Sequence, residues 1–243
     1  MSPEEFDVQF DVLYNNITSN QAPGLNEYEK SVFLTKAQDE ILKNHFISEA
    51  NILNKGIDAN TKRQIDFSNL IKVSEINTLS VDSGFDERSV TVVLPDDIMF
   101  ILNESVSVVN NTIRKNKQIR YLDYANYSTL MSKPYKRPLK NQVWRLLFNK
   151  AANDNVAELI LGYKDVFEKY VIKYIKKPNP IIVGDISQYG VTIEGFGGVT
   201  ECEVNPILHE EILQRAVELA KAAYVVTQSN EIQLLTTLGQ RSE

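Results

Sequence analysis

The histidines are the residues that raise the question of chemistry most directly. His209, Glu210 and Glu211 begin like H-E-x-x-H, the helical motif in which two imidazoles one turn apart bind zinc. The fifth position is Leu213, and the only other histidine is His45. We therefore interpret His209 as a polar first-turn residue of a packing helix and predict no metal site. A zinc-dependent hydrolase centred on His209 stays open as an alternative.

The single cysteine and the glycine-rich stretch do not form a catalytic pattern either. Cys202 lies between Glu201 and Glu203, and neighbouring carboxylates raise a thiol pKa, which opposes formation of the nucleophilic thiolate. The stretch 194–201, EGFGGVTE, resembles G-x-G-x-x-G only loosely. Its third glycine comes one residue early and no strong helix follows at once, so we expect a hairpin turn or bulge here.

Two acidic stretches were considered as cation sites. LPDD (94–97) has Pro followed by two Asp, which is mainly a turn signal. VDSGFDE (81–87) has the composition of a calcium loop but lacks its frame of alternating ligands. No combination of residues supplies a nucleophile, a base and oxyanion donors. We therefore predict no enzyme activity, no catalytic residues and no cofactor.

The one basic cluster lies at 133–140, KPYKRPLK. It consists of Lys133, Lys136, Arg137 and Lys140 beside the aromatic Tyr135. A solvated loop is the simplest interpretation. The alternative is a contact surface for an acidic protein partner or for DNA that passes close by.

Composition limits the class of protein. The chain has 243 residues, enough for one large domain or two small ones, and 26 Lys and Arg against 32 Asp and Glu give a net charge of −6. Proteins that wrap nucleic acid carry an excess of basic residues, so DNA contacts would have to be local. One cysteine fits a reducing compartment. The N-terminal residues lack the pattern of a signal peptide, and no stretch is long and apolar enough to predict a membrane span.

The elements that position these residues follow from periodicity. Apolar spacing of three and four predicts helices at 3–19 and 27–48, the second capped by Asn26, and a third that begins at Asn205 and Pro206. Short helices are expected at 61–69 and 123–132. Runs rich in β-branched and aromatic residues predict strands at 70–76, 89–95, 104–109, 117–122, 143–148, 156–161 and 169–175.

This order predicts an α+β fold rather than alternating βαβ units. We expect the terminal helices to pack as a small antiparallel helical bundle, with a β-rich domain inserted between them. The expected boundaries are 1–55 with 205–228 for the bundle, 56–204 for the insertion, and 229–243 for a flexible C-terminal tail.

Two long stretches carry a resemblance to a known family. These are 17–42, which contains A-P-G-L-N-x-Y-E-K-S, and 205–224, which contains L-H-E-E-I-L-x-R-A-V-x-L-A. The link YIKKPNPI (174–181) adds to it. Together they cover about a fifth to a quarter of the chain. In these stretches the sequence is similar to head–tail connector, adaptor or ring proteins, which are virion structural proteins of crAss-like and related tailed podoviruses.

The resemblance implies a function. Such proteins form a homo-oligomeric ring, commonly of twelve copies, that bridges the portal and the tail and extends the DNA channel. The implied partners are the portal protein, other ring or tail proteins, and genomic DNA that passes without sequence-specific binding. No membrane, cofactor or catalysis is implied. The implied location is the head–tail junction of the virion, after assembly in the bacterial host cytoplasm. The alternative is a DNA- or scaffold-binding accessory virion protein that uses the loop 133–140.

Overall fold

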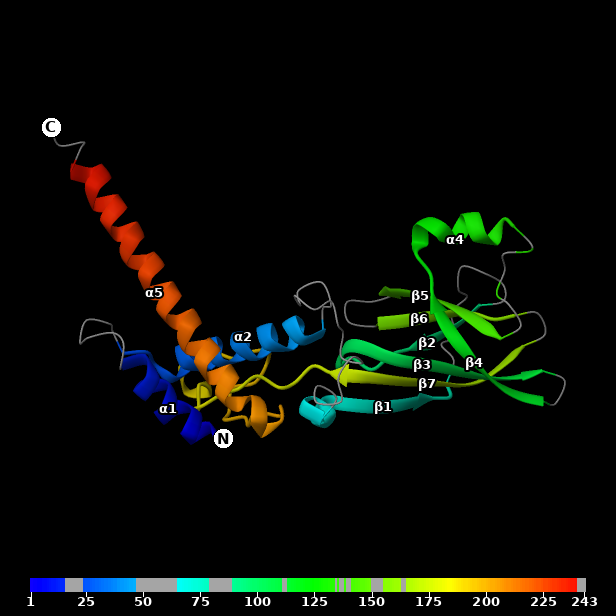
Figure 1. Cartoon of the computed structure of the whole chain (residues 1–243), viewed down its shortest axis with the longest axis horizontal. Coiled ribbons are helices and arrows are strands. Elements are labelled where there is room, and N and C mark those ends of the chain that lie inside the picture. Colours follow the sequence, from blue (N-terminus) through cyan, green and yellow to red (C-terminus); the bar gives the residue numbers. More distant parts are fainter. Residues whose placement is uncertain are drawn as a thin grey trace. The chain divides into compact units, whose positions relative to one another are not determined.

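The computed structural model describes residues 1–15, 24–46, 65–78, 89–110, 113–133, 135, 138, 141–149, 155–162 and 165–239. The chain divides into two compact units (Figure 1). Met1–Leu70 and Pro178–Glu243 form one, which we call the helical unit, and Ile71–Lys177 form the other, the β unit. The β unit is thus inserted between two halves of the helical unit.

The β unit contains a seven-stranded mixed sheet in the order β1-β7-β3-β4-β5-β6-β2. All strand pairs are antiparallel except β4 and β5, between which the chain crosses over through helix α4. The bounds are β1 Ile71–Ile76, β2 Ser89–Val93, β3 Ile98–Asn110, β4 Ile113–Tyr121, α4 Tyr124–Met131, β5 Gln142–Asn149, β6 Asn155–Ile160 and β7 Val166–Lys176.

The sheet curls into a half-barrel with an apolar cluster on each face. One face gathers the larger core, in which Val106, Leu159 and Tyr170 are almost fully buried. On the other face Trp144 and Ile160 pack beneath α4, which lies over β5 and β6 in Figure 1. Because successive residues of a strand point to opposite faces, Val143 of β5 belongs to the larger core while its neighbour Trp144 belongs to the cluster beneath α4.

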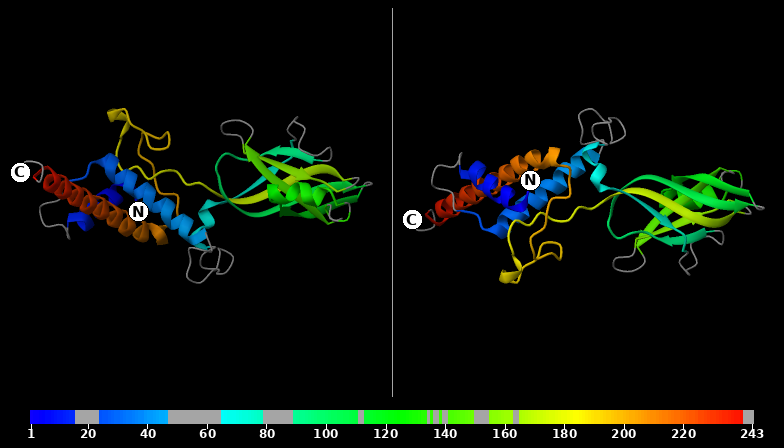
Figure 2. Two further views of the ribbon diagram at one scale, coloured as in Figure 1. Left: turned by 90° about the horizontal axis from the view of Figure 1, so that it is seen from above. Right: turned by 90° about the horizontal axis from the view of Figure 1, so that it is seen from below.

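The helical unit contains α1 (Pro3–Asn15), α2 (Glu27–Phe46) and α5 (His209–Gly239). Figure 2 shows α5 alongside the other two helices, and α2 packs on α5 more extensively than on α1. Glu29 and Asn26 form a reciprocal capping box, with N–H to carboxyl or amide oxygen distances of 2.9 and 2.8 Å, which confirms the predicted cap. Asn205 likewise caps the turn before α5 by accepting from the Ile207 N–H.

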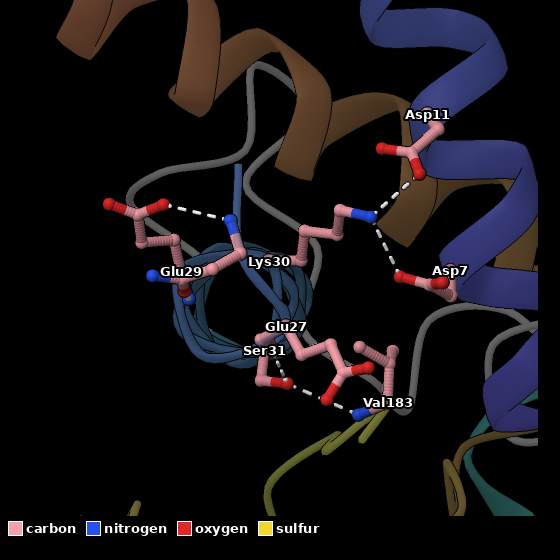
Figure 3. A network of polar contacts seen from close by, with 8 residues as sticks. Asp7, Asp11, Glu27, Glu29, Lys30, Ser31 and Val183 are labelled. Atoms are coloured by element: carbon pink, nitrogen blue, oxygen red, sulfur yellow. Dashed lines mark hydrogen bonds and ion pairs between the residues drawn. The ribbon is translucent and has the colours of Figure 1, made fainter. Parts of the chain in front are cut away.

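Helix α2 buries a polar stripe against an extended segment, residues 179–183. Ser31, Thr35 and Gln38 are spaced so that they share one helical face, and all three are buried. They bond to alternate residues of the segment in reverse order. The Val183 N–H donates to Ser31 Oγ (3.1 Å), Ile181 exchanges bonds with Thr35 Oγ1, and Gln38 Nε2 donates to the Asn179 carbonyl (3.0 Å) (Figure 3 draws the Ser31 end).

The predicted fold class was wrong in its main element. The chain is α+β, but its largest element is the curled seven-stranded sheet, not a small helical bundle. Four α-helices are present among the described residues, and α4 belongs to the β unit. The three terminal helices do not form a core from one another alone. The polar stripe of α2 needs backbone partners, and the segment 179–183 supplies them along with buried Ile181 and Ile182.

The individual strand predictions were better. All seven predicted runs are strands, and the helix expected at 123–132 is α4. Of the helix expected at 61–69, the described part ends in a short 3-10 turn, Ser68–Leu70. Helix α5 runs to Gly239 and so includes most of the segment 229–243, whose flexibility stays a prediction. No described helix has the length and apolarity that crossing a membrane requires.

Replacing Thr35 with Val should destabilise the helical unit. The change removes the hydroxyl that satisfies both polar groups of buried Ile181, which should cost about 1–3 kcal/mol of unfolding free energy. Far-UV circular dichroism in urea would report this loss. Thr35→Ser keeps the hydroxyl and should unfold close to wild type. The single tryptophan, Trp144, lies in the β unit, so its fluorescence provides an internal control. Equal midpoints for the Val and Ser variants would contradict the prediction.

Candidate functional site

His209 is a buried structural residue in this fold. Its side chain is 4% exposed, and its ring packs on Phe6 with centroids 5.3 Å apart. Nε2 lies 2.9 Å from the Val204 carbonyl and Nδ1 lies 2.7 Å from the amino group of Met1, so both nitrogens have partners. In the tautomer that fits, Nε2–H donates and Nδ1 accepts. Burial lowers the His209 pKa, the Val204 carbonyl opposes this, and the positive Met1 amine adds to it.

Glu210 and Glu211 are exposed, whereas the fifth position of the motif belongs to the core. Leu213 is almost fully buried with Ile212, Ala216 and Val217, as the predicted apolar stripe requires. Within the described part of the chain, no three His, Cys, Asp or Glu side chains are grouped closely enough to hold a metal ion. The extent of His209 burial was not predicted, because a first-turn position on a helix does not reveal what packs over it.

The stability of the chain should depend on the protonation of His209. Its folded-state pKa lies below the usual 6.5, so the unfolded chain binds the proton more readily. The contribution of neutral His209 to the free energy of unfolding is complete above about pH 6.5. As pH falls below that value the contribution is lost, by at most about 1.4 kcal/mol per pH unit. Urea midpoints between pH 7.5 and 5 would measure this slope. His209→Gln should flatten it, and an unchanged slope in that variant would contradict the assignment.

The Cys202 thiol is hydrogen-bonded and is not activated as a nucleophile. It lies 3.5 Å from Gln38 Oε1, to which it donates. Burial raises the Cys202 pKa to about 11, and Glu203 adds to the effect. The raised pKa agrees with the sequence interpretation, although burial contributes more than the neighbouring carboxylates. A thiol with this pKa is almost entirely protonated at neutral pH and is a poor nucleophile.

A charged network joins α1 to α2 (Figure 3). Lys30 Nζ lies 2.9 Å from Asp7 and 2.7 Å from Asp11, and its side chain is only 7% exposed. Burial would lower the Lys30 pKa, but the hydrogen bonds to Asp11 and Asp7 raise it overall. At the next turn Gly184 approaches so closely that a Cβ there would lie 2.0 Å from the Glu27 carboxylate. These contacts fix α1, α2 and the extended segment together.

Two buried ion pairs lie in the half-barrel. Glu104 pairs with Arg145 beside the buried Tyr170, and Lys117 pairs with Asp165. Burial raises the Glu104 pKa, and Arg145 opposes that rise. Because burying a charge is costly unless it is paired, each partner depends on the other. The sequence pattern did not predict either pair, because the two partners lie far apart along the chain.

Replacing Arg145 with Ala should unfold the β unit more easily by about 3–5 kcal/mol, because Glu104 would remain buried without its partner. The double variant Glu104→Leu/Arg145→Leu removes both charges and should recover most of that loss. Trp144 fluorescence in guanidinium measures it. An additive double variant, as unstable as the two single changes combined, would contradict the coupling.

The acidic stretches have ordinary structural positions. The segment 94–97 forms the predicted turn between β2 and β3. Asp97 lies 3.0 Å from Lys72 Nζ and accepts a hydrogen bond from the Tyr174 hydroxyl at 2.8 Å. Burial, and then this hydrogen bond, raise the Tyr174 pKa to about 12. The segment 81–87 lies outside the described residues.

The basic cluster is described only in part. Tyr135 is 77% exposed and Lys133 is half-buried just beyond α4. Lys136, Arg137 and Lys140 lie outside the described residues. A partner contact at this loop therefore stays a prediction.

A projecting loop carries two exposed aromatic residues that the sequence interpretation missed. In residues 185–199, which we call the aromatic loop, Tyr189 is 65% exposed, Val199 is 55% exposed and Phe196 is 41% exposed. Glu194 and Gly195 have φ of 52° and 87°, and the N–H groups and carbonyls of Ile193 and Phe196 bond reciprocally at 2.9 Å. This is a two-residue hairpin turn of the primed type, so the predicted hairpin turn is confirmed.

Comparison with known proteins defines the class of protein first: a virion structural protein that forms rings. The model of the family described as Phage tail ring protein 3/4 matches residues 1–232, and the chain belongs to this family. It is 51% identical over 247 residues to "Ring protein 4/5" of Bacteroides phage crAss001, with both chains covered completely. It is 31% identical over 231 residues to "Ring protein 3" of the same phage, covering 90% of this chain and 95% of that one.

Proposed function

We propose that this chain forms a closed ring at the head–tail junction of a crAss-like phage, bridging the portal and the tail and extending the DNA channel. The resemblance implies twelve copies. The observation that carries the proposal is the 51% identity to a crAss001 ring protein along the entire length of both chains. The match extends over both units of the chain rather than over a single domain.

Ring formation follows a physical constraint on contacts between identical chains. A heterologous contact joins one surface of a copy to a different surface of the next, and it closes without a free face only if the rotation completes a circle. Each chain must therefore carry two complementary surfaces. A division into two units, each with its own core, supplies separate supports for two such surfaces.

The charge of the chain suits a channel wall. With a net charge of −6 the protein repels rather than binds a phosphate backbone, apart from local basic groups. We propose that DNA passes the ring without sequence-specific binding. Assembly in the host cytoplasm fits the single cysteine, because one thiol cannot form a disulfide within the chain.

Purified chain, alone or added to isolated portal–tail complexes, should form closed rings around a central channel. Negative-stain electron microscopy would show them, and class averages would give the copy number. Microscopy of intact virions should place the ring between the portal and the tail. Absence of the chain from purified virions would contradict the proposal.

The alternative function, a DNA- or scaffold-binding accessory role for the loop 133–140, makes a different prediction. The chain would then bind duplex DNA with strong salt dependence, and a Lys133/Lys136/Arg137/Lys140 quadruple alanine variant would lose that binding. Under the ring proposal, fluorescence anisotropy should detect at most weak binding at physiological salt, and the quadruple variant should still form rings.

A further inference from the structure

The aromatic loop is held in shape by its own backbone. The N–H groups of Ile186 and Ser187 both donate to the Gly197 carbonyl, at 3.0 and 3.1 Å, and so close its base. Ile186 is fully buried and anchors the loop in the core of the helical unit. Ile182 and Thr200 pair just beyond the base. In both views of Figure 2 this segment, drawn in yellow to ochre, stands away from α2 and α5.

Its conformation is unusual for its sequence. Glu194 is the one described residue other than glycine with a positive φ, a conformation that side chains with a Cβ disfavour by about 1 kcal/mol or more. The Glu194–Gly195 turn leaves the Phe196 side chain exposed. Tyr189, at the end of a 3-10 turn that Gly190 terminates, is also exposed. A small exposed loop gains nothing for its own stability from exposing two aromatic rings. The arrangement instead favours binding.

Aromatic residues are enriched at protein–protein interfaces, and Tyr is among the residues that contribute most to binding energy. A preformed loop loses little conformational entropy when it docks, so more of the burial energy appears as affinity. The loop and its flanks, residues 178–204, contain no Lys or Arg. They carry the acids Asp185, Glu194, Glu201 and Glu203 instead, so their charge disfavours nucleic acid or a phosphate-bearing ligand. The exposed rings of Tyr189 and Phe196 favour a protein surface with apolar groups.

The β unit offers an apolar groove of matching character. It has a volume of about 380 Å³ and lies where β2 and β3 meet the ends of β5 and β6. Leu147, which is 42% exposed, lines it. Its other lining residues include Leu94, Ile98, Phe100, Phe148 and Val156. This volume accommodates an aromatic side chain, and nearly all of the lining groups are apolar.

We propose that the aromatic loop of one copy docks into the apolar groove of the β unit of the next copy, with Phe196 and Tyr189 as the anchoring side chains. The inference rests on the proposed ring of identical chains. A heterologous ring requires one projecting and one receiving surface on each chain. The described residues provide both, on different units: the exposed rings of the loop and the apolar lining of the groove.

Replacing both anchors, Tyr189→Ser/Phe196→Ser, should reduce ring formation at least tenfold by mass photometry and negative-stain microscopy. Circular dichroism should match wild type, because neither side chain belongs to the core. The control is Ile113→Ser/Val166→Ser, which removes two exposed apolar side chains of the β unit, 60% and 64% exposed, outside the groove. The control should form rings normally.

Cross-linking tests the partner directly. In a Cys202→Ser background, a Phe196→Cys chain mixed with a Leu147→Cys chain should form a disulfide-linked pair of different chains on mild oxidation. A mixture of Ile113→Cys with Leu147→Cys should not. Because each chain carries one thiol, the link can form only between copies.

The outcomes separate the two proposals. Wild-type rings together with intact rings of the Tyr189→Ser/Phe196→Ser variant would overturn the docking inference and leave the ring proposal standing. The same holds if that variant loses only its binding to portal–tail complexes, which would assign the loop to a different protein. A wild-type chain that forms no ring, alone or on those complexes, would overturn both.

Discussion

The helical unit depends on the match between one face of α2 and the extended segment 179–183. Side chains spaced by four and three residues along a helix lie about 5–6 Å apart, and alternate residues of an extended chain lie about 6.5 Å apart. Ser31, Thr35 and Gln38 can therefore serve as the hydrogen-bonding partner that a neighbouring strand would provide. Without them the N–H and carbonyl groups of a buried, non-helical segment would be left unsatisfied.

This match has consequences in both directions along the chain. Immediately before the segment, the chain leaves the sheet at the end of β7, Lys176. Immediately after it, the chain enters the aromatic loop, whose base is closed by Ile186 and Gly197. The loop can be rigid and exposed at once because it begins and ends at buried, hydrogen-bonded backbone. Helix α5 then follows from a capped turn at Asn205 and covers α1 and α2.

Several ion pairs of the described residues join two elements of the same unit. Lys30 joins α1 to α2, Arg215 forms a two-pronged pair with Glu40 across α5 and α2, and Glu104 with Arg145 lies inside the half-barrel. Each pair restricts how two elements can slide past one another. For a member of a family of ring proteins this is a useful property, because small errors in subunit shape accumulate around a closed ring and would prevent it from closing.

The sequence by itself determined the elements and their local ends. Alternation and turn residues located all seven strands, and the Asn26 and Asn205 caps were readable because capping depends on neighbours within three residues. The resemblance at 17–42 and 205–224 indicated the family. Tertiary structure decided what the polar face of α2 packs against, that the sheet rather than a helical bundle is the largest element, and that His209 is buried. It also decided which aromatic residues stay exposed. The physical reason is range: caps and periodicity are set by adjacent residues, whereas Thr35 meets Ile181, and Glu104 meets Arg145, only after segments far apart in the chain have packed.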